Sequence, residues 1–261
     1  MGARFGQHFL ANPHVAGRIA QALGLESGDA VLEIGPGKGA LTRHLLAGGA
    51  QVVGVEIDED LYKGLEGRFR GDRLTAVLGD VLKVDLASLF RGAKGPVKVA
   101  GNIPYKITSP LLERLTLWSG WDRAVLMVQE EVAKRITAPP GTKTYGVLSV
   151  GIQIVADTRF LFGLSKHSFR PVPKVDSAVI ELIRQPRGLP EKERKRVMSV
   201  VRAAFSQRRK TIANALSDGL DIPKGKVQEA LIAVGIDPGA RAETVGLEEY
   251  RRLSDALPPS P

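Results

Sequence analysis

The chain has 261 residues, of which 43% are hydrophobic and 25% charged, and its formal net charge is +9. Such a chain can bury one large core or a medium and a small one, and its basic excess makes nucleic acid the first partner to consider. It has no cysteine, four histidines without metal-site spacing, no signal-peptide core and no membrane-length apolar run, so we expect a cytoplasmic protein without metal or membrane binding.

Apolar runs alternate with helical patterns from residue 29 to about residue 130. The runs predict strands over residues 29–35, 51–58, 74–80, 97–102 and 123–129, and the patterns predict helices over 39–49, 59–69 and 109–117. Strands that are apolar throughout and separated by helices are typical of a parallel sheet covered on both faces. The expected fold is therefore a Rossmann-like, doubly wound α/β domain.

The pattern is less clear further along the chain. Residues 145–156 fit either a buried helix or a strand. Residues 157–164 and 174–183 predict a pair of closing strands on either side of a loop that two prolines make stiff. The pattern breaks near residues 184–190, after which helical spacing dominates. We therefore predict a first domain over residues 1–185 and a small all-helical domain over residues 186–261.

A glycine-rich loop follows the first predicted strand. Its glycines Gly35, Gly37 and Gly39 let the backbone approach a ligand closely where a helix begins. Ala40 completes the spacing G-x-G-x-x-A of a dinucleotide-binding loop. The loop alone leaves both NAD and S-adenosylmethionine open.

Two acidic residues follow the next two predicted strands. Glu56 ends the second strand, where a carboxylate can accept both ribose hydroxyls of an adenosine cofactor. Asp80 ends the third strand, where a carboxylate can accept from an adenine amino group, which a nicotinamide enzyme does not particularly need. The nearby Asp58 is expected to face solvent.

The fourth predicted strand ends in the turn Asn102-Ile103-Pro104-Tyr105. This turn resembles the N/D-P-P-Y/F turn of methyltransferases that act on planar amino nitrogens, whose lone pair is delocalised into the ring. Asn102 can accept one amine hydrogen, a backbone carbonyl near Pro104 can accept the other, and Tyr105 can stack on the base. Such a reaction depends on orientation and electrostatics and needs no strong general base.

Five segments in the same order resemble the ribosomal RNA adenine dimethyltransferase family. They are GQHFL (6–10), LEIGPGKGALT (32–42), NIPY (102–105), FRPVPKVDSAV (169–179) and FSQRRKTIANAL (205–216). The resemblance covers nearly the whole chain. It implies a class I methyltransferase that uses S-adenosylmethionine to dimethylate two adjacent adenosines near the 3′ end of small-subunit (16S) ribosomal RNA during small-subunit maturation.

The resemblance also implies roles for individual residues. The cofactor site would comprise His8, Leu10, Gly35, Gly37, Glu56, Asp80 and Asn102. The catalytic group would comprise Asn102, Pro104, Tyr105 and Phe169. Within these sets, Phe169 would form a second wall against the flipped base. His8 stands where many relatives have asparagine, at the methionine end of the cofactor.

RNA contact is expected in two places. The run from Lys192 to Lys210 has eight basic residues and only Glu193 as an acid. With the family resemblance, this run indicates phosphate contact in the helical domain. The candidate RNA-binding residues are Lys106, Arg170, Lys174, Arg208, Arg209 and Lys210. Residues 1–185 would then be the catalytic domain and residues 186–261 the RNA-binding domain of a monomer that acts on the immature small subunit.

Three alternatives remain open at this point. One is a related antibiotic-resistance methyltransferase of large-subunit RNA, which the segment FSQRRKT disfavours. Another is a non-catalytic nucleic-acid-binding factor on the same fold, which the intact Glu56, Asp80 and NIPY turn disfavour. A nicotinamide dehydrogenase is the weakest alternative, because nothing resembling its substrate machinery follows the glycine loop.

Overall fold

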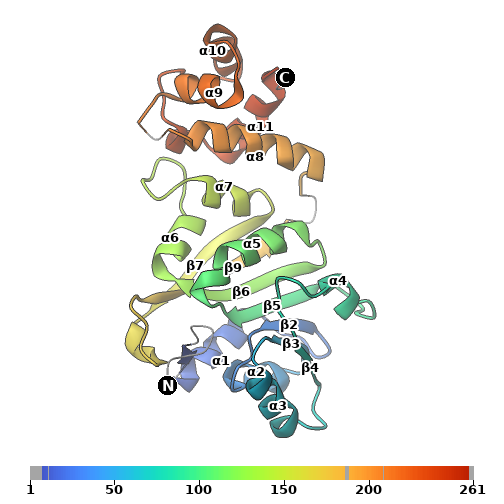
Figure 1. Cartoon of the computed structure of the whole chain (residues 1–261). Helices are drawn as coiled ribbons and strands as arrows, with labels where there is room; N and C mark the ends of the chain where they lie inside the picture. Colours follow the sequence, from blue (N-terminus) through green and yellow to red (C-terminus); the bar gives the residue numbers. More distant parts are fainter. Residues whose placement is uncertain (1–7, 11, 186–187, 208, 259–261) are drawn as a thin grey trace. The chain divides into compact units, whose positions relative to one another are not determined.

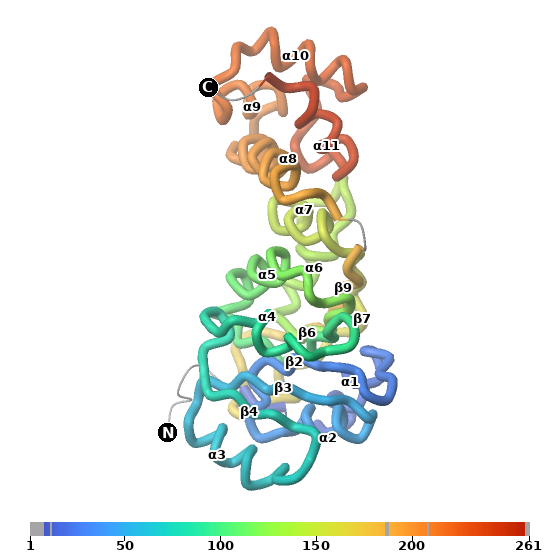
Figure 2. Tube along the Cα trace, turned by 90° about the vertical axis from the view of Figure 1, so that its right-hand side faces the viewer, coloured from blue at the N-terminus to red at the C-terminus, as the bar shows by residue number. Residues whose placement is uncertain are grey.

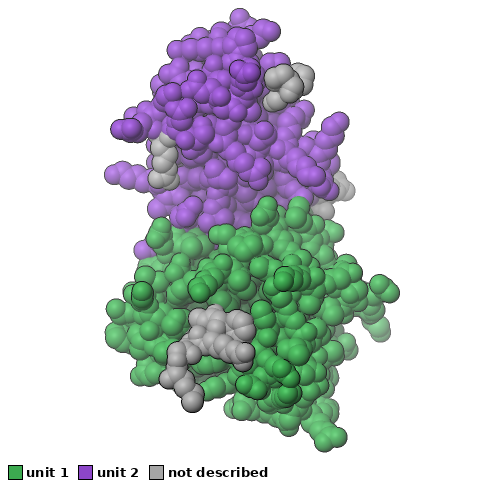
Figure 3. All heavy atoms as spheres, in the orientation of Figure 1, with its two compact units in different colours: residues 1–133, 157–186 green, residues 134–156, 187–261 purple. Residues whose placement is uncertain are grey.

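The computed structural model describes residues 8–10, 12–185, 188–207 and 209–258 (Figure 1). The chain divides into two compact units, coloured separately in Figure 3. Unit 1 comprises residues 1–133 and 157–186, and unit 2 comprises residues 134–156 and 187–261. Unit 1 holds the strands described below, whereas the regular structure described in unit 2 is almost entirely helical.

Unit 1 contains a seven-stranded sheet in the order β4-β3-β2-β5-β6-β9-β7. Its strands are β2 (Ala30–Ile34), β3 (Gln51–Glu56), β4 (Leu74–Leu78), β5 (Val97–Asn102), β6 (Trp121–Gln129), β7 (Ala156–Leu164) and β9 (Ser177–Arg184). The five strands from β4 to β6 in this order pair in parallel, and β9 pairs antiparallel with β6. The predicted doubly wound sheet is therefore confirmed, with the two closing strands at one edge.

Five helices of unit 1 flank the sheet. They are α1 (Pro13–Ala22), α2 (Ala40–Ala47), α3 (Glu59–Arg68), α4 (Leu86–Leu89) and α5 (Thr108–Leu117). The chain moves outward from β2 to β4 and then returns to β5, so right-handed crossovers place α2 and α5 on opposite faces, as Figure 2 shows.

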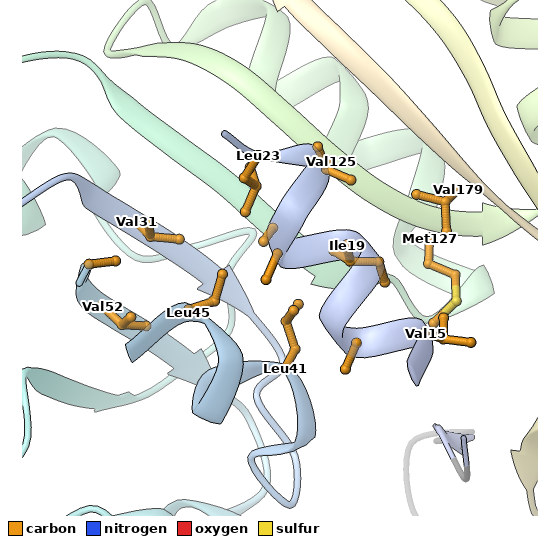
Figure 4. Close-up of a cluster of buried hydrophobic side chains, with 14 of the residues drawn as sticks. Val15, Ile19, Leu23, Val31, Leu41, Leu45, Val52, Val125, Met127 and Val179 are labelled. Atoms are coloured by element: carbon orange, nitrogen blue, oxygen red, sulfur yellow. The ribbon is translucent and has the colours of Figure 1, made fainter. Parts of the chain in front are cut away.

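The apolar core of unit 1 lies between the sheet and helices α1 and α2. Val15 and Ile19 are four residues apart and face the sheet from one stripe of α1. Figure 4 shows this stripe beside Val125 and Met127 of β6, with Leu45 of α2 on its other side. All five side chains are buried, so burial of this stripe anchors α1 on the sheet.

The strand order reverses between β2 and β5. From β2 the chain continues to β3 on one side, whereas the later strand β5 lies on the other side. Loops that leave the carboxyl ends of these two strands diverge and open a crevice between them. The glycine loop follows β2 and the NIPY turn ends β5, so the fold brings both motifs to this crevice.

Among its described residues, unit 2 contains four α-helices after residue 187 and one before it. They are α7 (Val147–Gln153), α8 (Glu191–Phe205), α9 (Ile212–Leu220), α10 (Lys224–Ala233) and α11 (Leu247–Ala256). Helix α6 (Glu130–Ile136) runs across the division between the units. The aromatic ring of Tyr145 lies 6.2 Å from that of Phe205, which lies 6.2 Å from that of Tyr250. These rings join the segment before α7 to α8 and α11.

This division differs in part from the predicted domains. The predicted boundary after residue 185 lies next to the observed division after residue 186. Residues 134–156, however, belong to the helical unit and not to the first domain. The ambiguous segment 145–156 forms α7, and β7 begins at its last residue. Val150, Ile152, Ile154 and Val155 are buried and α7 packs against α8, so apolar residues occur on several sides of the helix and periodicity alone does not distinguish helix from strand.

None of the helices in the described part of the chain is long and apolar enough to cross a membrane. Among the same residues, no group of three or more histidine, aspartate or glutamate side chains is placed to hold a metal ion.

Candidate functional site

A cavity of about 370 Å³ opens in unit 1 at the carboxyl ends of β2, β3, β4 and β5. The candidate residues that line it are His8, Leu10, Gly35, Gly37, Glu56, Asp80, Asn102, Pro104, Tyr105, Lys106 and Phe169. The fold thus brings together at one cavity all the candidate cofactor and catalytic residues. A volume of this size lies in the range of small-molecule sites.

The glycine loop and Glu56 form one hydrogen-bonded unit. Gly37 has a φ of +59° and donates its amide hydrogen to Glu56 Oε2 at 2.9 Å. The other oxygen of Glu56, Oε1, accepts from the amide of Asp58 at 3.0 Å. The Glu56 side chain is buried at the cavity wall, and its two oxygens connect the glycine loop to the start of α3.

The two aspartates near this wall have different local roles. Asp58 Oδ1 accepts from the amides of Asp60 and Leu61 and caps helix α3. Asp58 is buried, so the expectation that it faces solvent is wrong. Asp80 Oδ1 accepts from the amide of Leu82 at 2.9 Å, which fixes the carboxylate in the turn after β4 beside the cavity.

Glu33 is a cavity residue that the sequence reasoning did not single out. It lies in β2, lines the cavity and is only 1% exposed. Its Oε2 is buried without a hydrogen-bond partner among the described residues. Burial raises the pKa of Glu33 to about 8, and the charge of Glu56 adds to this, whereas hydrogen bonding from Thr42 opposes it. The feature of the sequence that could have identified Glu33 is its position in the segment LEIG, which leads into the glycine loop.

The NIPY turn holds its side chains through contacts with distant segments. Asn102 Nδ2 donates to the carbonyl oxygen of His8 at 2.8 Å. The carbonyl of Pro104 accepts from the amide of Ile107 at 3.0 Å and from Thr108 Oγ1 at 3.4 Å, which closes the turn that leads into α5. Proline fixes φ here and makes the turn rigid.

Tyr105 is oriented by a buried serine. Its hydroxyl lies 3.0 Å from Ser177 Oγ, and Ser177 is 1% exposed at the start of β9. The two residues are 72 positions apart in the chain, so no local pattern indicates this contact. The hydrogen bond fixes the phenol end of a ring whose other atoms line the cavity.

A short segment from His8 to Leu10 contacts several parts of this site. Strand β1 (Phe9–Leu10) pairs antiparallel with β8 (Phe169–Arg170). The ring of Phe9 lies so close to the glycine loop that a Cβ atom on Gly37 would be 3.3 Å from it. Lys38 Nζ lies 4.9 Å from the centre of the same ring. Phe9 is thus a second cavity residue that the sequence reasoning missed, and residues 6 and 7 of its motif lie outside the described residues.

Phe169 lies between the cavity and the apolar core of unit 1. It lines the cavity, but it is also 1% exposed and belongs to the apolar core cluster of unit 1. The next residue, Arg170, is exposed and donates from its guanidinium to the carbonyls of His167 and Phe169. These bonds hold Arg170 back against its own loop.

The candidate RNA-binding residues fall in both units. Lys106 and Lys174 are exposed in unit 1, and Lys106 lines the cavity. In unit 2, Arg209 is exposed, whereas Lys210 forms an ion pair of 2.8 Å with Asp218 that lowers the pKa of that aspartate. Arg208 lies outside the described residues. Within the basic run, Lys195 and Arg196 also form ion pairs, with Glu191 and Asp255.

Comparison with known proteins identifies the family. A sequence profile of the family described as ribosomal RNA adenine dimethylase matches residues 2–258. The chain belongs to this family. The ribosomal RNA small subunit methyltransferase A of Thermosynechococcus vestitus is 42% identical to it over 97% of this chain and 96% of its own. The protein of the same name from Moorella thermoacetica is 43% identical over 97% and 91% of the two chains.

Solved structures agree with this membership. The 23S rRNA methyltransferase ErmE superposes on this family member with a TM-score of 0.76 and 30% identity, over 95% of this chain and 99% of its own. A dimethyladenosine transferase from Plasmodium falciparum gives a TM-score of 0.77 with 26% identity, over 94% and 96% of the two chains. The class I methyltransferase fold expected from the sequence is confirmed.

Proposed function

We propose that this protein transfers methyl groups from S-adenosylmethionine to the N6 atoms of two adjacent adenosines near the 3′ end of small-subunit ribosomal RNA. The observation that supports this proposal most directly is that the NIPY turn lies at the same cavity as Glu56 and Asp80. The small-subunit enzymes are 42–43% identical to this chain, whereas the large-subunit enzyme ErmE is 30% identical, which supports the small-subunit substrate.

The cavity residues fit this cofactor. The unpartnered, buried Oε2 of Glu33 leaves an acceptor for a cationic or hydroxyl group, and burial penalises its charge unless a positive group lies nearby. In the proposal, Glu56 holds the ribose and Asp80 the adenine, while Gly35, Gly37, Leu10 and the main chain of His8 contact the rest of the cofactor. S-adenosylmethionine supplies an electrophilic methyl group on a sulfonium centre.

Asn102 and the turn orient the amine that receives the methyl group. Asn102 Nδ2 is engaged by His8, so its Oδ1 is the atom that accepts one amine hydrogen. The Pro104 carbonyl already accepts Ile107 N–H, and we therefore place the second acceptor at the carbonyl of Ile103, which also lines the cavity. Two acceptors of this kind favour a pyramidal nitrogen whose lone pair faces the methyl group.

Two aromatic residues hold the target base. Tyr105, fixed by Ser177, stacks on one face of an adenine taken out of its helix. Phe169 bounds the other side through the part of its ring that faces the cavity. Because Phe169 is otherwise buried in the core, its position is rigid, and it limits the depth to which a base can enter.

Basic residues hold the RNA backbone. Lys106, Arg170 and Lys174 are placed around the adenine-binding end of the site in this proposal, and Arg208, Arg209 and Lys210 contact phosphates from the helical unit. Lys210 exchanges its ion pair with Asp218 for a phosphate when RNA binds. The protein acts in the cytoplasm as a monomer on the immature small subunit, with unit 1 catalytic and unit 2 RNA-binding.

The test is transfer of labelled methyl groups to unmodified small and large ribosomal subunits, followed by mapping of the modified nucleotides. We expect dimethyladenosine only in small-subunit RNA, loss of transfer in Asn102→Ala, and a strong reduction in Tyr105→Ala. Methylation of large subunits would favour the ErmE-like substrate. Binding of RNA without cofactor binding in calorimetry would favour a non-catalytic factor. Full activity in Asn102→Ala would refute the roles given to the turn.

A further inference from the structure

His8 contacts two site segments through different atoms. Its carbonyl oxygen accepts from Asn102 Nδ2 at 2.8 Å, and its ring nitrogen Nδ1 lies 2.8 Å from the carbonyl oxygen of Pro171. Its ring centre is 6.1 Å from that of Tyr105, with the planes tilted by 32°. Both hydrogen bonds of His8 are thus made to protein groups, one in the NIPY turn and one in the loop after β8.

The bond to Asn102 fixes which end of that amide faces the cavity. A carbonyl oxygen has no hydrogen to donate, so only the NH₂ end of Asn102 can face the carbonyl of His8. The oxygen Oδ1 is then turned away from His8. The terminal torsion of an asparagine is broad and nearly two-fold, and the side chain itself does not favour this orientation over the reverse. The carbonyl of His8 therefore selects the orientation in which Oδ1 is free to accept.

The hydrogen bond to Pro171 fixes the position of the His8 carbonyl, which orients the Asn102 amide. Because the Pro171 oxygen can only accept, His8 Nδ1 must carry the hydrogen of this bond. The bond joins positions 163 residues apart. It continues the pairing in which Phe9 lies opposite Arg170 and Leu10 opposite Phe169. The His8 side chain thus extends the pairing of β1 with β8 by one residue. The same residue, His8, provides the carbonyl that contacts Asn102.

We propose that the side chain of His8 is a positioning residue: by donating from Nδ1 to the Pro171 carbonyl, it holds its own carbonyl where that oxygen orients the amide of Asn102 for catalysis. This assigns the side chain to Pro171 and not to the cofactor, and it rests on the function proposed above. The role requires a hydrogen-bond donor at the position of Nδ1.

Asparagine and aspartate provide a matched test. In His8→Asn, the atom Nδ2 is separated from Cβ by the same two bonds as histidine Nδ1, and it can donate. In His8→Asp, an oxygen that cannot donate when ionised occupies that place. The two variants are nearly isosteric and differ in the donor and in the charge of the ionised carboxylate, and His8→Ala removes the donor without adding a charge. Thermal unfolding of each variant verifies that it is folded.

Three quantities are measured at pH 7.5 with the full chain. They are the Kd for S-adenosylmethionine by calorimetry, and kcat and KM for methylation of unmodified small subunits. We expect kcat within about threefold of the parent in His8→Asn and at least about tenfold lower in His8→Asp and His8→Ala, with cofactor Kd changed less than about threefold. Equal losses of kcat in His8→Asn and His8→Asp, or a tenfold weaker cofactor Kd with unchanged kcat, would overturn the proposal.

A readout that needs no substrate separates this inference from the proposed function. Proton exchange at the side-chain amide of Asn102, followed by NMR, reports the bond to the His8 carbonyl. We expect one slowly exchanging Nδ2 proton in the parent and in His8→Asn, and faster exchange in His8→Asp. Slow exchange in all three would overturn the inference. An absence of methyl transfer by the parent, with the expected exchange pattern, would instead count against the proposed function alone.

Discussion

Glu56 Oε2 accepts a hydrogen bond from the main-chain amide of Gly37 at 2.9 Å, across 19 positions of the chain. Its Oε1 accepts from the amide of Asp58 at 3.0 Å, so one carboxylate holds both the glycine loop after β2 and the start of α3. The side chain is 2% exposed. A residue expected only to bind ribose therefore also stabilises the loop that forms the cavity wall.

Replacement of Glu56 is expected to destabilise the protein even without ligand. In Glu56→Ala two buried amides lose a charged acceptor, at about 1.5–3 kcal/mol each, and we expect the free energy of unfolding to fall by about 3–6 kcal/mol. Glu56→Gln should lose less, because its one remaining oxygen can still accept. Urea unfolding measures both, with the exposed Glu113→Ala as a control that stays within about 0.5 kcal/mol. Parent-like stability in Glu56→Ala would contradict the coupling.

Stability should depend on pH through Glu33. Its pKa is raised by burial from 4.5 to about 8, so the folded state binds this proton more tightly than the unfolded state. The contribution of Glu33 is fully present below about pH 4.5 and is lost as the pH rises to about 8. In Glu33→Gln this loss is absent, and we expect a smaller fall of stability from pH 5 to pH 8 than in the parent. Unfolding curves at several pH values measure the slopes, and equal slopes would show that Glu33 does not titrate in this range.

The two buried tyrosines of unit 2 should respond differently to loss of the hydroxyl. The hydroxyl of Tyr250 donates to the carbonyl of Ala242 at 2.7 Å, whereas that of Tyr145 is buried without a partner among the described residues. We expect Tyr250→Phe to cost about 1 kcal/mol, and Tyr145→Phe to be neutral or slightly stabilising. Each variant removes one hydroxyl oxygen from a buried tyrosine, so the two variants serve as controls for each other. A larger loss in Tyr145→Phe than in Tyr250→Phe would be inconsistent with these contacts.

Gly39 should not tolerate a side chain. Its φ is +79°, and a Cβ atom there would lie 2.4 Å from Cε2 of Phe69. We expect Gly39→Ala to cost about 1–3 kcal/mol, because backbone strain and a core clash act together. In Gly64→Ala, where a Cβ meets open space on exposed helix α3, we expect stabilisation by about 0.5–1 kcal/mol. Chemical denaturation compares the two variants, and a neutral Gly39→Ala would mean that Phe69 can move aside.

The sheet could be predicted because its signals are local. Strand β5 spans Val97–Asn102 as expected, since a short apolar run that only Lys98 interrupts, followed by a polar turn, has few other solutions in an α/β chain. Gly35, Glu56, Asp80 and Asn102 could likewise be placed at one cavity, because each lies at the end of a parallel strand or shortly after it, and such strands end at the same edge.

The features of the site and of the domain division that could not be predicted depend on contacts between residues far apart in the chain. The bonds from His8 to Asn102 and Pro171 span 94 and 163 positions, and no periodicity indicates them. Phe9 was not singled out, because only its packing against the glycine loop relates it to the cavity. The place of residues 134–156 was missed for the same reason, since the partners of Tyr145 lie far along the chain in α8 and α11.

The composite origin of unit 2 constrains how this chain can be recombined with a relative. A chimera that exchanges only residues 187–261 would pair Phe205 and Tyr250 of one parent with Tyr145 of the other. The graft would therefore join two halves of one core that were not selected together. Exchange of residues 134–156 along with the terminal segment keeps that core intact, so chimeras that exchange the helical unit need two grafted segments and three junctions.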